Sequence, residues 1–124
     1  MKILTARNII RKNQILLDLD TLLDLPNRED ENYMEYLKTV KDDLDKNGML
    51  NPILVVEKKN YWNRLPWRDD NKKYGVVTGS NRYRYAIDNG YELIESIVCT
   101  GRNEWFDLWS KTFFRVKSEG CQKT

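Results

Sequence analysis

The sequence predicts an α/β (α+β) domain in which helices flank a small mixed sheet. Short runs rich in β-branched residues, such as Ile53–Val56, are typical of buried strands. Between such runs, apolar residues recur at helical spacing, most clearly over residues 31–47. Glycine and proline stand at the junctions, among them Gly48, Pro52 and Gly79. Strands that alternate with helices in this way favour one layered α/β core.

Length and composition are those of a single domain spanning residues 1–124. Hydrophobic residues make up 40% of the chain, enough for a packed core, and charged residues make up 32%. The formal net charge is only +2, so nucleic-acid binding would need a local basic patch. The apolar runs are too short to cross a membrane, and the first residues do not resemble a signal peptide. We therefore expect a cytoplasmic protein.

Histidine is absent, and the two cysteines, Cys99 and Cys121, stand far apart in the sequence. Without imidazole the chain has no Ser-His or Cys-His nucleophile pair and no His-containing zinc site. Cys99 falls in a strand-like run, where a buried structural thiol is expected rather than a reactive one. The composition thus excludes several common catalytic classes, and we predict no metal ligands.

Two elements are predicted in the first part of the chain. Residues 15–22 alternate in part between apolar and polar side chains, which predicts an edge or half-buried strand. The helix predicted over 31–47 has one apolar face and one solvated face of Lys and Asp residues. The apolar face consists of Tyr33, Leu37, Val40 and Leu44. Gly48 is a suitable residue to end this helix.

Two strands, a polar insert and a short helix follow. Pro52 favours an extended entry into a buried strand over 53–57, and a second strand is predicted over 74–78. The insert between them, residues 58–73, is long for a hairpin connection. After the second strand, residues 80–89 are predicted to form a helix that ends at a glycine.

A third buried strand is predicted over 93–100, and an aromatic helix over 103–117 completes the domain. One face of that helix carries Trp105, Leu108, Trp109, Thr112, Phe113 and Val116, and Phe106 and Phe114 widen it. We expect this face to pack over the sheet. A homodimer contact through the same helix is the alternative interpretation.

The turn before the helix 80–89 carries the most recognisable chemistry. Gly79 allows a sharp change of backbone direction, and Ser80 or Asn81 is a suitable N-cap. Unpaired N–H groups at a helix start, together with the guanidinium of Arg82, form a suitable site for a phosphate group. The alternative interpretation is an ordinary capped helix with surface arginines.

Two segments together resemble the ParB N-terminal/sulfiredoxin superfamily. Residues 37–55 are similar to its helix–Gly–x–x–x–Pro–Ile–strand signature, whose loop, residues 48–52, we call the first box. The second box, residues 79–84, reads Gly-Ser-Asn-Arg-Tyr-Arg. ParB proteins have Gly-Glu-Arg-Arg there, followed by an aromatic residue and Arg, and sulfiredoxins have Gly-Cys-His-Arg-Tyr. Asn27-Arg28 also matches an Arg that precedes the helix in ParB proteins, and the resemblance covers about 15–100.

The resemblance implies a small α/β fold that holds a nucleotide between the two boxes. In the first box, Gly48, Asn51 and Pro52 would approach the base or ribose. In the second box, Gly79, Ser80, Asn81 and Arg82 would hold the phosphates, with Arg84 nearby. The cofactor implied is a nucleotide with Mg²⁺.

Ser80 departs from both branches of the superfamily. It replaces the Glu that ParB proteins use in nucleotide and metal chemistry and the Cys nucleophile of sulfiredoxins. Sulfinic-acid reduction is therefore not expected, because no thiolate stands at this position. A serine hydroxyl could attack a phosphoryl group only beside a base, and Asp88 and Glu92 are the carboxylates nearby in the sequence.

The insert mixes cations with aromatic rings. Trp62, Arg64, Trp67 and Arg68 could stack on bases and follow a phosphate backbone, so they are candidate nucleic-acid contacts. The alternatives are a lid over a bound ligand and a hairpin tip whose tryptophans pack back on the domain.

We expect a stand-alone ParB-like domain, of the type common in phage and mobile-element genomes, that binds a nucleotide or a nucleic-acid phosphate. One alternative is a phosphotransferase, NTPase or nuclease that uses the same pocket. The other is a degenerate protein-interaction module.

Overall fold

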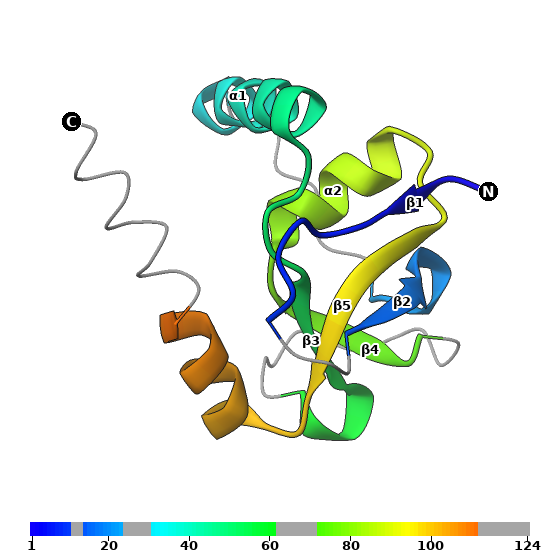
Figure 1. The fold of residues 1–124 in the computed structure, drawn as a ribbon, viewed down its shortest axis with the longest axis vertical. Helices are drawn as coiled ribbons and strands as arrows, with labels where there is room; N and C mark the ends of the chain where they lie inside the picture. Colours follow the sequence, from blue (N-terminus) through cyan, green and yellow to red (C-terminus); the bar gives the residue numbers. More distant parts are fainter. Residues whose placement is uncertain (11–13, 24–30, 62–71, 112–124) are drawn as a thin grey trace.

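The structure, a computed structural model, describes residues 1–10, 14–23, 31–61 and 72–111 of the chain. Its strands are β1 (Ile3–Leu4), β2 (Ile15–Asp18), β3 (Ile53–Glu57), β4 (Tyr74–Thr78) and β5 (Leu93–Cys99). Its helices are α1 (Glu31–Asn47), α2 (Ser80–Asp88) and a further helix over 102–111 (Figure 1). The predicted small mixed sheet flanked by helices is confirmed.

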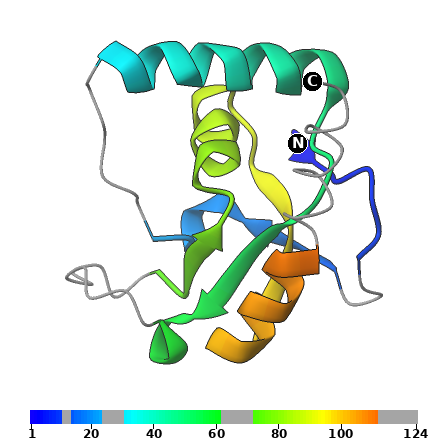
Figure 2. The ribbon, with the colours of Figure 1, turned by 90° about the vertical axis from the view of Figure 1, so that its left-hand side faces the viewer.

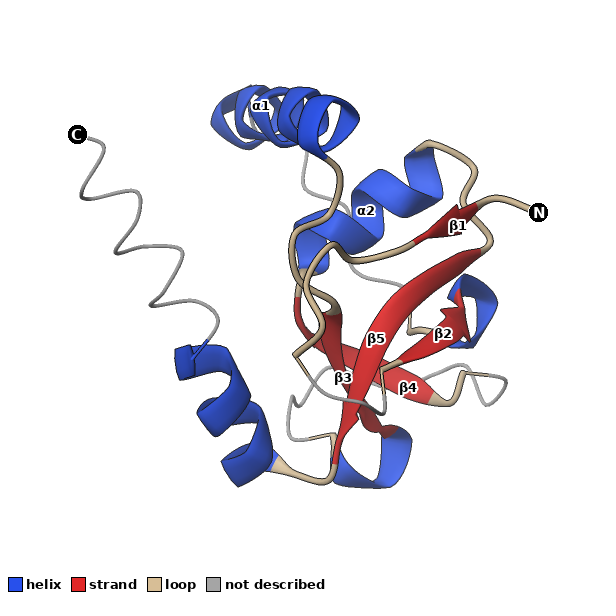
Figure 3. Cartoon of the chain, in the orientation of Figure 1, coloured by secondary structure: helices blue, strands red, loops and turns tan. Residues whose placement is uncertain are grey.

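β5 is the central strand of the sheet. It pairs in parallel with β1 and β3 and antiparallel with β2. β3 in turn pairs antiparallel with β4, so the path across the sheet is β1-β5-β3-β4 (Figure 3). The β3–β4 hairpin therefore places the end of the first box beside the start of the second box.

Helices cover both faces of the sheet, and Figure 2 shows α1 lying across the end of α2. Alternate residues of β3 enter two different cores, as the two-residue period of a strand requires. Ile53 and Val55 pack with Leu44 of α1 and with Tyr83 and Ala86 of α2. On the opposite face, Leu54 and Val56 pack in a second core with Ile97, Cys99 and Leu108. Burial on both faces explains the continuous apolar run of β3.

Most predicted boundaries are confirmed. The bounds of α1, β3 and β4 are those expected from the sequence, and α2 and β5 each end one residue early. The strand predicted over 15–22 ends at Asp18 instead, because the Asp18 side chain accepts a bond from the Asp20 N–H at 3.0 Å and opens a 3₁₀ turn, Leu19–Thr21. β1 was not predicted, since two residues carry no periodic pattern.

The aromatic helix packs over the sheet in its described part. Leu108 is only 6% exposed, and the rings of Trp105 and Trp109 stack with centroids 6.0 Å apart against the second core. Phe106 remains exposed. Residues 112–117 of the predicted helix lie outside the described residues, and a homodimer contact through this helix stays a prediction.

Two further expectations concern burial and the membrane. Cys99 is 1% exposed, which confirms the structural thiol. In the described part of the chain, no helix combines the length and the apolar character needed to span a membrane.

Candidate nucleotide-binding pocket

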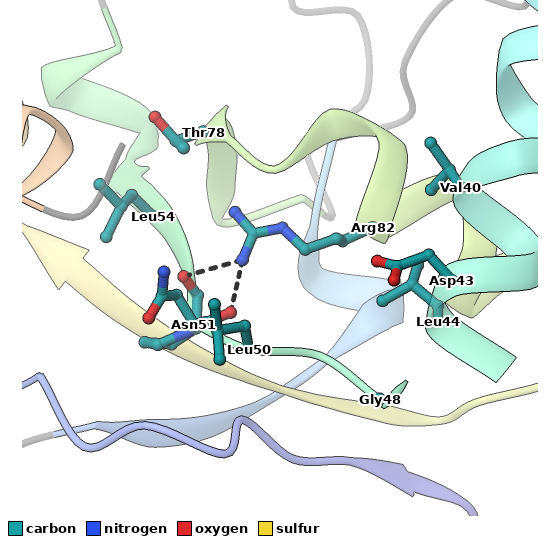
Figure 4. Close-up of a pocket in the computed structure, with 10 residues that line it drawn as sticks. Val40, Asp43, Leu44, Gly48, Leu50, Asn51, Leu54, Thr78 and Arg82 are labelled. Atoms are coloured by element: carbon teal, nitrogen blue, oxygen red, sulfur yellow. Dashed lines mark hydrogen bonds between the residues drawn. The ribbon is translucent and has the colours of Figure 1, made fainter. Parts of the chain in front are cut away.

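A pocket of about 300 Å³ lies between α1, the first box and the start of the second box (Figure 4). Its volume is at the lower end of the range for ligand sites. The wall is lined by Val40, Asp43, Leu44, Gly48, Leu50, Asn51, Pro52, Leu54, Thr78 and Arg82. The lining combines five apolar residues with four polar side chains, and small-molecule sites likewise pair an apolar surface with a few polar groups. The two boxes recognised in the sequence thus share one pocket.

The first box starts where α1 stops. Gly48 adopts φ +75°, a left-handed conformation that glycine accepts without strain, and its N–H donates to the Leu44 carbonyl at 2.9 Å. This confirms Gly48 as the predicted helix stop. Pro52 then leads into β3. The first box is consequently fixed at both ends by regular structure.

The N-terminal segment also holds the first box in place. The N–H groups of Arg7 and Asn8 donate to the carbonyls of Met49 and Leu50, each at 2.9 Å. The Asn8 side chain bonds that of Asn51, Nδ2 to Oδ1, at 3.1 Å. The segment therefore acts as a short extra strand beside the first box. This support could not be foreseen, because it depends on pairing rather than on a local pattern.

Gly79 is the N-cap of α2, in place of the predicted Ser80 or Asn81. Its φ is +106°, so the sharp turn expected from the sequence is confirmed. A Cβ atom here would lie 2.6 Å from Cγ2 of Ile53 and 2.8 Å from Nη2 of Arg82. Only glycine fits this position. Because Gly79 has no side chain to cap the helix, the N–H groups of the first turn of α2 keep their hydrogen-bonding capacity for another acceptor.

Arg82 connects the two boxes. Its Nη1 donates to the carbonyl oxygen of Asn51 and, at 3.3 Å, to that of Pro52. Burial lowers the pKa of the Arg82 guanidinium to about 10, which leaves it a cation at neutral pH. Figure 4 shows the second terminal nitrogen directed away from these two carbonyls. Arg82 thus fixes the first box and still offers N–H groups to an anion.

The hairpin is irregular at its pocket end. Leu54 pairs with Thr78, but Val55 pairs with Val76, so the register shifts between Leu54 and Val55. Bulges of this kind re-aim side chains and are frequent beside functional sites. Both Leu54 and Thr78 line the pocket. Thr78 Oγ1 also accepts a bond from the indole N–H of Trp105 at 2.7 Å, which ties the aromatic helix to the pocket wall.

Two of the predicted phosphate ligands are held away from the pocket wall. Asn81 Oδ1 accepts a bond from the Tyr33 hydroxyl at 2.6 Å, and Arg84 Nη1 donates to the same hydroxyl at 2.8 Å. Neither residue lines the pocket, and neither does Ser80, which is exposed in the first turn of α2. Of the predicted ligands, the structure brings together Gly48, Asn51, Pro52 and Arg82, which all line the pocket. Gly79 lies against the Arg82 guanidinium.

The rings of Tyr83 and Tyr85 in α2 are both buried, at 5% and 8% exposure. The Tyr85 hydroxyl donates to Asp45 Oδ1 of α1 at 2.8 Å, so its polar end is satisfied within the protein. Neither ring is available to a nucleotide base.

Sequence reasoning missed Asp43, whose carboxylate belongs to the pocket lining. Asp43 stands on the charged face of α1, which was expected to be solvated throughout. By contrast, Asp88 lines a different pocket, together with Asn81, and Glu92 is exposed beyond the far end of α2. The position of α1 over the first box, rather than any local motif, makes Asp43 a site residue.

The predicted contacts Trp62, Arg64, Trp67 and Arg68 lie outside the described residues, as does Arg28. Within the described ranges, no group of three or more Cys, Asp or Glu side chains could hold a metal ion. Among the described residues that line the pocket, Asp43 is the one that carries a carboxylate. A Mg²⁺ ion here would therefore depend on phosphate oxygens and water for its other ligands.

No protein-family model matches the chain, and no curated protein matches its sequence. Solved structures do resemble it. The C-terminally truncated chromosome-partitioning protein ParB from Caulobacter crescentus, complexed with CTP-gamma-S, matches 80% of this chain with a TM-score of 0.52 and 19% identity. A mutant free serine kinase in complex with ADP matches 78% with a TM-score of 0.50 and 13% identity. These likenesses confirm the ParB/sulfiredoxin-like fold.

The chain spans 52% of that ParB structure and 36% of the kinase structure. Sulfiredoxin from Arabidopsis thaliana also matches, with a TM-score of 0.47 and 21% identity over 76% of this chain.

Proposed function

We propose that this protein binds a nucleotide in the pocket between the two boxes. The observation that carries the proposal is the shared pocket itself, which is lined by the first box on one side and by Thr78 and Arg82 on the other. The fold supports it too, since the ParB and free serine kinase structures that share it hold CTP-gamma-S and ADP.

The phosphates would lie at the start of α2. There the N–H groups of the first turn and the positive end of the helix dipole favour an anion. The Arg82 guanidinium adds a fixed charge and planar donors, which suit phosphate oxygens. Its existing bonds to the Asn51 and Pro52 carbonyls keep it in place before ligand arrives, so less entropy is lost on binding.

The base would lie against the apolar part of the wall. Val40 and Leu44 of α1 and Leu50 and Pro52 of the first box provide that surface. A planar base gains free energy from burial there. The division of the pocket into an apolar and a cationic part thus matches the two ends of a nucleotide.

A thermal-shift panel tests this proposal. ATP, ADP, CTP and GTP are each added with and without Mg²⁺, beside short single- and double-stranded DNA. A nucleotide at a hundred times its Kd should stabilise the protein by about 2.7 kcal/mol. Absence of a shift with every nucleotide would refute the proposal, and a shift with DNA alone would show that phosphate is bound elsewhere.

A matched pair of variants locates the ligand. Leu50 and Ile87 are both exposed, at 40% and 48%, but only Leu50 lines the pocket. Leu50→Glu places a negative charge in the apolar wall that would hold the base and should remove the nucleotide-dependent shift. Ile87→Glu makes the same change on the surface of α2 and should retain the shift. An equal response of both variants would contradict binding in this pocket.

Phosphoryl transfer is a second candidate function, which Asp43 favours. Its carboxylate could take the proton from a water or hydroxyl that attacks the terminal phosphorus, while the shortened nucleotide leaves with the bridging oxygen. Release of inorganic phosphate from ATP with Mg²⁺, lost in Asp43→Asn, would support turnover. If wild-type protein releases none above background, hydrolysis of ATP in this pocket is refuted.

A further inference from the structure

A second cleft lies at the other end of the β3–β4 hairpin. It is open, has a volume of about 730 Å³, and is lined by Glu57, Lys58, Lys59, Lys72, Lys73 and Tyr74. β3 and β4 both extend between this cleft and the pocket formed by the two boxes. Glu57 pairs with Tyr74 at the cleft end of the hairpin, and Leu54 pairs with Thr78 at the pocket end. The two sites are therefore separate.

Four lysines meet in this cleft because two lysine pairs flank the hairpin. Lys58 and Lys59 follow β3 in a 3₁₀ turn, Lys58–Asn60, and Lys72 and Lys73 precede β4. The backbone joins the pairs, since the Lys58 N–H donates to the Lys73 carbonyl at 2.9 Å. Residues 62–71, which separate the pairs in sequence, lie outside the described residues.

Among the described residues that line the cleft, lysines outnumber acidic side chains by four to one. Glu57 is the one acidic side chain among these described residues, and it pairs with Lys59 at 3.5 Å, both side chains being exposed. Lys72 Nζ donates to the main-chain carbonyl of Asp20 at 2.9 Å, a contact that fixes the ammonium without neutralising it. A whole chain with a formal net charge of only +2 thus concentrates positive charge at one place.

We propose that the cleft lined by Lys58, Lys59, Lys72 and Lys73 binds the phosphodiester backbone of a nucleic acid without sequence preference. Lysines are flexible point charges, which suit an extended polyanion better than one enclosed phosphate, for which arginine forks or buried donors are typical. The cleft is wide and open, and a nucleic-acid strand presents a phosphate at every nucleotide, so several lysines can engage it together.

The salt dependence of binding tests this inference. A fluorescein-labelled random-sequence DNA duplex of about 20 base pairs, and the corresponding single strands of DNA and RNA, are titrated with protein between about 50 and 200 mM salt. Lys59→Gln/Lys73→Gln removes two exposed ammonium groups from the cleft. Lys38→Gln/Lys46→Gln removes two exposed ammonium groups from α1 and serves as the matched control.

We expect the wild type to bind. In the cleft variant, the slope of log K against log salt should become less negative by about 1.8 for duplex, or by about 1.4 for single strands. The control should retain the wild-type slope. Both variants should keep the wild-type thermal shift with nucleotide, which separates this inference from the pocket. No binding by wild type, an unchanged slope in the cleft variant, or an equal loss in the control would each overturn it.

Discussion

Arg82 donates from Nη1 to the carbonyl oxygen of Asn51, although the two residues are 31 positions apart in the sequence. The bond joins the start of α2 to the first box, and the pocket lies between them. The bond matters for stability because the Arg82 guanidinium is half-buried. A half-buried guanidinium without hydrogen-bond acceptors would lower the free energy of unfolding by several kcal/mol. Pocket shape and pocket charge therefore depend on one side chain.

Replacement of Arg82 should change both the shape and the charge of the pocket. We expect Arg82→Ala to lower nucleotide affinity by roughly 10- to 100-fold, because a charge-assisted phosphate contact contributes about 1.5–3 kcal/mol. Isothermal titration calorimetry measures the change. Arg102→Ala removes an exposed arginine from the helix 102–111 and should leave affinity unchanged. Equal affinities of Arg82→Ala and wild type would rule out a role for Arg82 in binding.

Gly79 should not tolerate a side chain. In Gly79→Ala the new Cβ would meet Ile53 at 2.6 Å, and a φ of +106° is strained for alanine. We expect a loss of about 2–4 kcal/mol in the free energy of unfolding, measured with urea. Gly90→Ala is the matched control, with φ +75° and open space around its Cβ, and should lose only about 1 kcal/mol. Similar losses in both would contradict the close packing at Gly79.

Asp43 should oppose the binding of an anion in the absence of metal. Its carboxylate lines the pocket that would hold the phosphates. We expect Asp43→Asn to lower the Kd for Mg²⁺-free nucleotide by about 2- to 10-fold, as removal of a nearby like charge should. Asp42→Asn changes an exposed neighbour that does not line the pocket and should have no effect. Weaker Mg²⁺-free binding by Asp43→Asn would show that its carboxylate contacts a donor group of the ligand.

Stability at acid pH should depend on Asp45. Its carboxylate accepts bonds from Lys41 and Tyr85, and these bonds lower its pKa, the Lys41 contact more strongly. The folded pKa is below the unfolded one, so this stabilisation is complete above the unfolded pKa and is lost as the pH falls through the folded pKa. Urea unfolding below about pH 5 should show a shallower pH dependence for Asp45→Asn than for wild type. Parallel curves would refute this linkage.

Prediction from the sequence succeeded where a local pattern decides the structure. The apolar spacing of α1, its stop at Gly48 and the buried run of β3 are each encoded in neighbouring residues. The second box was recognised from Gly79 and Arg82 for the same reason.

The rest depends on contacts between distant segments. Asp43 is exposed, as the charged face of α1 predicts, but it lines the pocket only because α1 lies over the first box. Asn8 supports Asn51 only through pairing. Asn81 is a good N-cap residue in isolation. Its side chain instead accepts a hydrogen bond from the Tyr33 hydroxyl, and Gly79 is the N-cap. The lysine cleft likewise forms because β3 and β4 pair, which brings Lys58 beside Lys73.

The most direct test of the central claim is a ¹H–¹⁵N NMR titration of the full chain with nucleotide. The account predicts that the backbone amides of residues 48–51 and 78–82 shift together and saturate with one Kd, whereas those of Lys58 and Lys73 remain in place. Shifts confined to the lysine cleft, or spread evenly over the surface, would contradict a nucleotide pocket between Asn51 and Arg82.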